Sequence, residues 1–137
     1  MKHRVLSHEE LTDRWHEIKP FVDKSLVHGT GDMIAHDLLI ECLKNVSQCW
    51  VMDDEEGNLL GVAITRIITH SRYNELVIVT TTISGWFDEG PEVLEDIEQF
   101  ARDIGCKYTS VYGRKGWARA LEKHGYKSPY TILMKEV

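Results

Sequence analysis

The sequence predicts a mixed α/β (α+β) fold, in which helices flank a mixed, mostly antiparallel sheet and the elements follow the order ααβββαβαβ. Two observations carry this prediction. The hydrophobic spacing has a helical period up to about residue 46 and changes to β-branched, strand-like segments from Gln48 onward. Farther on, a strand, a helix and a second strand follow one another between residues 75 and 112, the pattern of a crossover between parallel strands.

Two helices are expected at the start of the chain. Ser7 and Glu10 have the spacing of a capping box, which predicts a helix that begins after Ser7. Its apolar stripe ends near Pro20, a residue that usually stops a helix. A second helix is expected after Asp32, which suits a capping position, and its apolar positions recur as far as Val46.

Three strands are expected next, arranged as a meander. Residues 49–52 and 59–70 are separated by the acidic turn 53–58, and residues 75–83 form the third strand. The apolar run in this third strand predicts a central position, buried on both faces.

The last third of the chain completes the crossover. A helix is expected over residues 91–104, because Pro91 suits a first helical turn and Gly105 suits a helix end. A strand over 107–112 follows. The remaining expected elements are a short helix, 116–124, and a closing strand, 130–135.

Composition limits the class of protein. The 137 residues are 42% hydrophobic and 28% charged, which predicts a single domain over residues 1–137. A net charge of −6 argues against nucleic acid as a partner, and no apolar run suggests a membrane span or a signal peptide. Three cysteines without a pairing pattern indicate reduced thiols, so a cytoplasmic protein is expected.

Two segments of the C-terminal half carry a family resemblance. Residues 93–106 (VLEDIEQFARDIGC) and 120–126 (ALEKHGY) resemble two segments of the GNAT N-acetyltransferase superfamily, and the element order agrees over about residues 48–137. The resemblance implies a GNAT-like fold and transfer of an acetyl group from acetyl-CoA to a primary amine. The segment 113–117 (GRKGW) also resembles a divergent branch of such proteins encoded by bacteriophages.

The resemblance also implies where acetyl-CoA would bind. The family's pyrophosphate loop, which uses free N–H groups at a helix N-terminus, falls on residues 85–90. Asp88 stands where the loop has its middle glycine, and Glu89 adds a second carboxylate beside it. These two residues either weaken binding of the pyrophosphate or serve as capping residues of the helix. The positions expected to contact the cofactor are Thr80, Thr82, Gly85, Gly90 and Arg114.

The family's general acid is missing, because Leu121 stands where many members have a tyrosine. Tyr112 is the candidate substitute acid, with the alternative that its ring packs in the core. Glu75, beside His70, is the candidate general base, with the alternative that both are solvated turn residues.

Other residues leave alternatives open. Trp86 and Phe87 either fill the cleft between the parallel strands or contact a partner. Basic residues at 114, 115, 119 and 123 could receive the adenosine phosphate of CoA or an acidic protein, or could be only solvated. No metal is expected, because His28, Asp32 and His36 lack a third helical ligand at matching spacing.

Two functions therefore remain open at this stage. One is an acyl-CoA-dependent N-acyltransferase. The other is a non-catalytic bacteriophage protein, structural, virion-associated or an assembly factor, which retains the fold and works in the host cytoplasm or the virion. In either case the expected partner is an amine substrate or another phage protein, and neither nucleic acid nor a membrane is expected.

Overall fold

A computed structural model describes residues 2–83, 86–113 and 115–137. The strands are β1 (Lys2–Val5), β2 (Ser47–Asp53), β3 (Leu59–Thr69), β4 (Asn74–Ile83) and β5 (Tyr108–Val111), and the helices are α1 (His8–Leu26), α2 (Ala35–Leu43), α3 (Trp86–Asp103) and α4 (Lys115–Glu122). The strands lie side by side in chain order, and every pair is antiparallel except β4 with β5. The predicted mixed, mostly antiparallel sheet and the parallel crossover are therefore confirmed.

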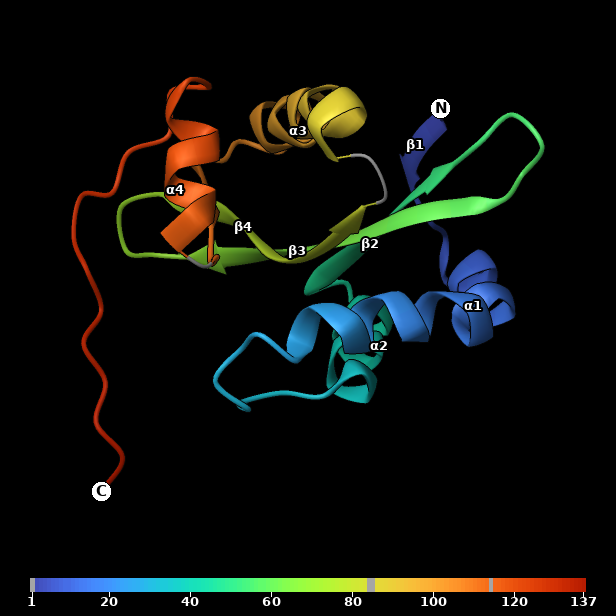
Figure 1. Ribbon diagram of the computed structural model, residues 1–137, viewed down its shortest axis with the longest axis horizontal. Coiled ribbons are helices and arrows are strands. Elements are labelled where there is room, and N and C mark those ends of the chain that lie inside the picture. The colour runs from blue at the N-terminus through green and yellow to red at the C-terminus, as the bar shows by residue number, and fades with distance from the viewer. Residues whose placement is uncertain (1, 84–85, 114) are drawn as a thin grey trace.

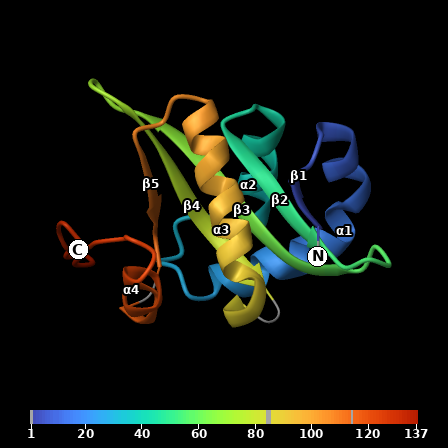
Figure 2. The ribbon, with the colours of Figure 1, turned by 90° about the horizontal axis from the view of Figure 1, so that it is seen from above.

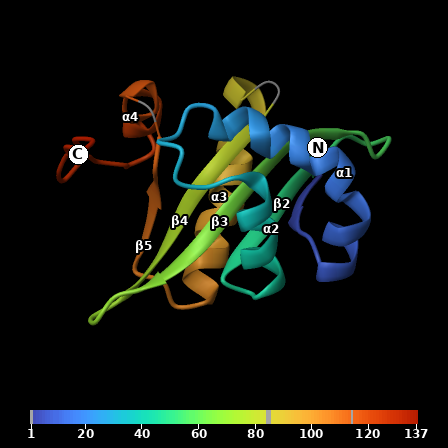
Figure 3. The ribbon, with the colours of Figure 1, turned by 90° about the horizontal axis from the view of Figure 1, so that it is seen from below.

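The sheet is the middle of three layers (Figure 1). Helix α3 crosses one face (Figure 2), whereas α1 and α2 cover β2, β3 and β4 on the other, with β5 beyond them (Figure 3). Each face buries its own apolar cluster: Ile18, Leu38 and Ile64 belong to the α1/α2 side, and Leu76 and Ile97 belong to the α3 side. Since both faces are covered, β4 is buried over Leu76–Ile78, as the sequence predicts.

Helix α1 begins as predicted but continues past its predicted end. The capping box is present, with the backbone N–H of Glu10 donating to Ser7 Oγ at 3.2 Å. The helix then runs through Pro20 to Leu26, so the predicted end at Pro20 is wrong. Val22 lies beyond the proline and is 1% exposed, and burial of such a side chain is worth about 1.5–3 kcal/mol. The burial of residues after Pro20 thus offsets the helical hydrogen bond that the proline removes.

Helix α2 is shorter than predicted at both ends. Its first-turn carboxylate is that of Asp37, which accepts from the backbone N–H of Ile34 at 3.0 Å, so Asp32 is not the capping residue. The helix ends at Leu43, and Val46 lies outside it and is exposed.

Strand β1 is absent from the predicted order. It pairs with β2 from Lys2 opposite Asp53 to Val5 opposite Trp50. Contacts outside the sheet also hold it: His3 forms an ion pair with Asp96 of α3, and Arg4 Nη1 lies 2.6 Å from Glu10 Oε2. Four residues with adjacent basic side chains carry no strand periodicity, so the pairing with β2 and these tertiary contacts define the strand.

Helix α3 starts at Trp86, earlier than the predicted start at Pro91. Asp88 and Glu89 then fall in its first turns, where the helix dipole favours negative charge. The predicted end is confirmed: Gly105 has φ +84°, and the N–H of Cys106 donates to Ala101 O at 2.8 Å.

The predicted closing strand over 130–135 is wrong, because residues 126–137 form neither strand nor helix. Leu133 is 90% exposed and Met134 is 75% exposed. The alternation that predicts the strand is real, but no neighbouring strand pairs with it in the described part of the chain. Figure 1 shows this segment extending away from the three layers.

Within the described residues, no helix combines the length and the apolar character that crossing a bilayer requires.

Replacing Pro20 with Ala is expected to stabilise the protein. Pro20 is exposed in α1, so Ala restores a helical hydrogen bond without disturbing the core. We expect the free energy of unfolding to rise by about 1–3 kcal/mol. Proline costs about 3 kcal/mol in a helix interior, but it also restricts the conformations of the unfolded chain, and this second effect reduces the gain. Chemical denaturation measures the gain. Lys19→Ala, at the neighbouring exposed position, is the control, and an equal gain there would contradict the interpretation.

Candidate active site

The candidate site lies where the parallel strands β4 and β5 separate. Their pairing runs from Glu75 opposite Tyr108 to Ile78 opposite Val111, and the N–H of Tyr112 makes the last contact, 3.4 Å from Ile78 O. Beyond this point β4 continues to Ile83, whereas the chain after β5 turns into α4. Part of the β4 backbone therefore lies beyond its register with β5.

A β-bulge lies at the point where the pairing of β4 with β5 ends. On β3, Ile64 lies opposite Thr80 and Thr65 lies opposite Ile78, so Val79 is an extra residue in β4. A bulge bends its strand and increases the local twist. Because Val79 follows the last residue of β4 that pairs with β5, the bend occurs where the two strands part.

The side chains of the predicted contact residues on β4 are engaged within the protein. Thr80 is buried, and Thr82 Oγ1 donates to the backbone oxygen of Phe21 in α1 at 2.8 Å. The latter bond ties the far end of β4 to α1. Any contact of these positions with a ligand would therefore come from their backbone groups.

Glu75 is the centre of a polar cluster at the other end of the β4–β5 pair. His70 Nε2 lies 2.6 Å from Glu75 Oε1, and Ser110 Oγ donates to Glu75 Oε2. Burial raises the pKa of this carboxyl group, but the bonds from Ser110 and His70 outweigh it, so the pKa is lowered. Glu75 therefore bridges two strands as a carboxylate, which differs from the alternative of a solvated turn residue.

The distance from Glu75 to the strand separation limits its role. Glu75 precedes Ile78 by three residues, which is about 10 Å along a strand. Ser110 is a residue that the sequence analysis missed. Its own sequence pattern does not identify it, because only the parallel register of β5 with β4 brings Ser110 beside the start of β4.

Tyr112 lies directly at the strand separation. Its side chain is exposed, with 58% of the residue accessible, which differs from the alternative of a ring packed in the core. Burial of its hydroxyl group, the charge of Glu75 and the nearby Tyr130 raise its pKa, and Arg66 partly opposes them. Tyr112 thus keeps its proton at neutral pH, so it can donate a hydrogen bond or a proton.

Leu121 occupies the core and not a reacting position. It is 3% exposed within the apolar cluster under α3. Helix α4 reaches this place by a close approach at Gly113, where an added Cβ would lie 2.8 Å from Trp117 Cδ1. The glycine lets the tryptophan ring pack directly on the backbone that leaves β5.

Several predicted positions lie outside the described residues or have side chains that are not described. Gly85 and Arg114 lie outside them. Trp86, Phe87, Asp88, Glu89 and Gly90 have a helical backbone in α3, and their side chains are not described. Residues 86–90 are therefore not the predicted loop, and within α3 the N–H groups of residues 86–88 have no helical partner.

The remaining candidates do not join the site. Among the described residues, no group of three His, Cys, Asp or Glu side chains could hold a metal ion. Burial raises the pKa of the Cys42 thiol to about 12, which disfavours a reactive thiolate. Arg119 lines an open hollow of about 480 Å³ beside Tyr126, and a second hollow of about 220 Å³ lies between α1 and β2; β4 and β5 line neither.

Comparison of the sequence with protein-family models and with curated proteins finds no significant match. Solved structures, in contrast, match over nearly the whole chain, and their fold is that of GNAT acetyltransferases. A ribosomal-protein-alanine N-acetyltransferase from Brucella melitensis has a TM-score of 0.74 at 8% identity, covering 100% of both chains.

Two further structures have the same fold. An aminoglycoside acetyltransferase from an uncultured soil sample, solved with sisomicin, has a TM-score of 0.71 at 14% identity, covering 99% of this chain and 95% of that one. A GNAT family acetyltransferase from Staphylococcus aureus has a TM-score of 0.65 at 16% identity, covering 99% and 98%. The predicted GNAT-like fold is therefore confirmed, and nothing in these comparisons indicates a bacteriophage branch.

Glu75→Gln is expected to change how stability depends on pH. The pKa of Glu75 is lowered below its usual 4.5 in the folded state, so its ionised form stabilises the fold above that pH. We expect the variant to lose about 1–3 kcal/mol at pH 7, the range for bonds to charged groups, and the difference from wild type to shrink as pH falls below 4.5. Thermal melts from pH 7 to pH 3 measure this, with Glu55→Gln in an exposed turn as the control. A difference that is independent of pH would contradict the assignment.

Gly113→Ala is expected to destabilise the protein, because the new methyl group would meet the Trp117 ring at 2.8 Å and displace α4. Overpacking of this kind costs about 1–3 kcal/mol. Gly116→Ala, inside α4, is the control: nothing lies within 4 Å of its added Cβ, so it should stabilise the helix by about 0.5–1 kcal/mol. Denaturation with urea compares the two, and equal effects would argue against the close approach at Gly113.

Proposed function

We propose that this protein is an acyl-CoA-dependent N-acyltransferase that transfers an acetyl group to a primary amine. The observation that carries the proposal is the separation of β4 from β5 after the bulge at Val79. Beyond the separation, main-chain groups of β4 are in a position to bind an extended chain carrying amide groups, such as pantetheine, where a neighbouring strand would otherwise lie. The whole-chain likeness to acetyltransferase structures supports this reading.

The N-terminus of α3 is the proposed phosphate site. This helix directly follows β4, so its free N–H groups at residues 86–88 and the positive end of its dipole face the same end of the sheet as the separation. Gly85, Gly90 and Arg114 are the neighbouring positions that we propose to contact the CoA phosphates, together with the backbone of Thr80 and Thr82. Asp88 and Glu89 would lower the affinity for this polyanion, so we expect weak binding of CoA.

The proposed reaction is a direct transfer. The amine nitrogen attacks the thioester carbonyl, the new C–N bond forms, and the C–S bond breaks with its electron pair leaving on sulfur. Tyr112 is the proposed acid that protonates this thiolate, because it lies at the separation and keeps its proton at neutral pH. Glu75 is the proposed acceptor of the amine proton through water, because it is ionised but lies about 10 Å along the strand from the separation.

The burial of Leu121 favours a second hypothesis. Without a hydroxyl group at the family's usual acid position, the fold could be retained for binding alone, in a structural or virion-associated bacteriophage protein. Under this hypothesis Tyr112 takes no part in a reaction. Substitution of Tyr112 therefore distinguishes the two hypotheses.

Titration calorimetry with acetyl-CoA is the direct test of binding, and release of CoA thiol in the presence of amines is the test of transfer. Because the fold neighbours include a ribosomal-protein-alanine N-acetyltransferase and an aminoglycoside acetyltransferase, the amine panel should contain an alanine-initiated peptide and sisomicin. Tyr112→Phe should lower kcat by about 10²-fold with unchanged CoA affinity. Tyr108→Phe, on the same strand and 52% exposed, is the matched control. Failure to bind acetyl-CoA at millimolar concentration would overturn the proposal.

A further inference from the structure

Strand β5 turns one face toward the side of the sheet that carries α1 and α2. Successive residues of a strand point to opposite sides of the sheet. Thr109 points to the α3 side, because its hydroxyl group lies 2.8 Å from that of Tyr126, which donates to Glu98 of α3 at 2.9 Å. Ser110 therefore points to the α1/α2 side, where these helices cover β2, β3 and β4, with β5 beyond them (Figure 3). Ser110 is partly accessible there.

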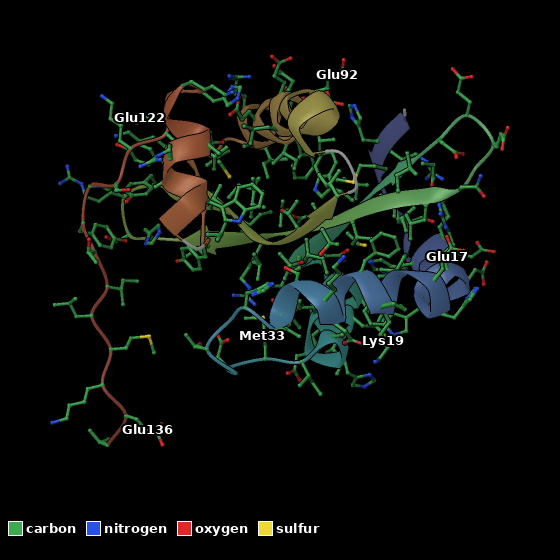
Figure 4. The ribbon with its side chains drawn as sticks, in the orientation of Figure 1. Glu17, Lys19, Met33, Glu92, Glu122 and Glu136 are labelled. Atoms are coloured by element: carbon green, nitrogen blue, oxygen red, sulfur yellow. The ribbon has the colours of Figure 1, made fainter. Side chains whose placement is uncertain are left out.

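The connection between α1 and α2 borders this face of β5. It reaches farther toward β5 than either helix does (Figure 3), and Figure 4 shows Met33 of this connection on the opposite side of the sheet from Glu92 of α3. Tyr112 follows Ser110 by two residues in the same alternation, and the negative charge of Glu75 helps to raise the pKa of its hydroxyl group. Ser110, Glu75 and Tyr112 thus share one accessible face.

The hydroxyl group of Ser110 is locked as a hydrogen-bond acceptor toward any further partner. It has one proton, which it donates to Glu75 Oε2, while His70 Nε2 lies 2.6 Å from the other carboxylate oxygen. The bond from Ser110 cannot run the other way, because the pKa of Glu75 is lowered and its carboxyl group has no proton at neutral pH. A molecule that binds to Ser110 Oγ therefore has to donate, as an N–H or O–H group does.

The charges around Ser110 favour a cation among such donors. The carboxylate of Glu75 lies directly behind the hydroxyl group. Arg66 is also on this side of the sheet, but its guanidinium group makes two bonds to Glu41 of α2, at 2.7 and 2.9 Å, so its charge is compensated. Lys107 precedes β5 and is at the end of the strand remote from the separation. An ammonium group at Ser110 thus lies in a field that is dominated by the carboxylate.

The spacing along β5 fits an amine between Ser110 and Tyr112. Ser110 lies opposite Val77, one residue before the last pair of β4 and β5, whereas Glu75 is three residues before it. Two residues of a strand span about 7 Å. An amine nitrogen about 2.9 Å from Ser110 Oγ can therefore also lie within about 3–3.5 Å of a thioester carbon beside Tyr112, which is the distance that an attack requires.

We propose that Ser110 accepts a hydrogen bond from the ammonium group of the acceptor substrate and thereby selects alkyl amines that are protonated at neutral pH. This inference rests on the proposed function, because it concerns the amine that receives the acetyl group. The structural alternative is that the bond from Ser110 to Glu75 only ties β5 to β4. The two differ in a measurable way: loss of a tie affects every amine equally, whereas a hydrogen bond to a charged donor is stronger than one to a neutral donor.

Acetyl transfer to ethylamine and to trifluoroethylamine at neutral pH tests the inference. The two amines have nearly the same shape, but ethylamine is protonated under these conditions and trifluoroethylamine is largely neutral. Ser110→Ala should raise KM by about 10–100-fold for ethylamine and by about 2–10-fold for trifluoroethylamine, the ranges that hydrogen bonds to charged and to neutral groups imply. The affinity for acetyl-CoA, measured by calorimetry, should not change.

Further variants separate binding of the amine from folding. Ser110→Thr keeps a hydroxyl group and should restore most of the KM for ethylamine. Ser71→Ala, at an exposed position in the turn between β3 and β4, is the matched control and should leave both KM values unchanged. Thermal melts check that each variant is folded. Ser110→Cys replaces Ser110→Ala if the latter does not fold, because a thiol has a similar shape and is a weak acceptor.

Two outcomes would overturn the inference and leave the proposed function standing. One is a folded Ser110→Ala protein whose KM is unchanged or changes equally for the two amines. The other is a fall in kcat alone, since Ser110 would then not bind the amine. Failure of the unaltered protein to bind acetyl-CoA or to acetylate any amine is a separate result, because it overturns the proposed function and this inference with it.

Discussion

The extra residue at Val79 is the constraint on which the arrangement of the C-terminal half depends. Without it the register of β4 with β3 would continue unchanged past Ile78. With it, β4 bends after Ile78, and its far end is held instead by the bond from Thr82 to α1. Main-chain groups of β4 beyond Ile78 lack a neighbouring strand, which is unfavourable. Burial on both faces of the sheet offsets this and keeps the strand in place.

Polar side-chain contacts fix the register of the strands, which apolar packing alone does not specify. Inside the sheet, Trp50 Nε1 donates to Thr65 Oγ1 at 3.1 Å and Thr65 Oγ1 donates to Gln48 Oε1 at 2.7 Å, which joins β2 to β3 in one register. At the rim, Glu75 joins the β3–β4 turn to β5 through His70 and Ser110. Satisfied networks of this kind specify one arrangement of the strands, because any shift would leave buried polar groups without partners.

Elements with a strong local period could be predicted from the sequence, and boundaries set by tertiary contacts could not. The capping box of Ser7, the strands β2, β3 and β4 and the crossover follow from local pattern. The prolines do not mark the helix boundaries: α1 continues past Pro20, and α3 begins before Pro91. Strand β1 depends on contacts with α1 and α3 from distant parts of the chain, and residues 130–135 keep the alternation of a strand without its pairing. For the site, Tyr112 and Glu75 could be identified, whereas Ser110 required the register of β5.

The two edges of the sheet differ in a way that bears on solubility. Both edge strands are four residues long, but the β1 edge is basic, and its His3 and Arg4 are bound to acidic groups of α3 and α1. Charged, short edge strands resist the addition of further strands, which is how natural sheets avoid growth into fibrils. A chain with one such blocked end cannot extend its sheet in both directions, so this sheet cannot act as a template for open-ended cross-β stacking.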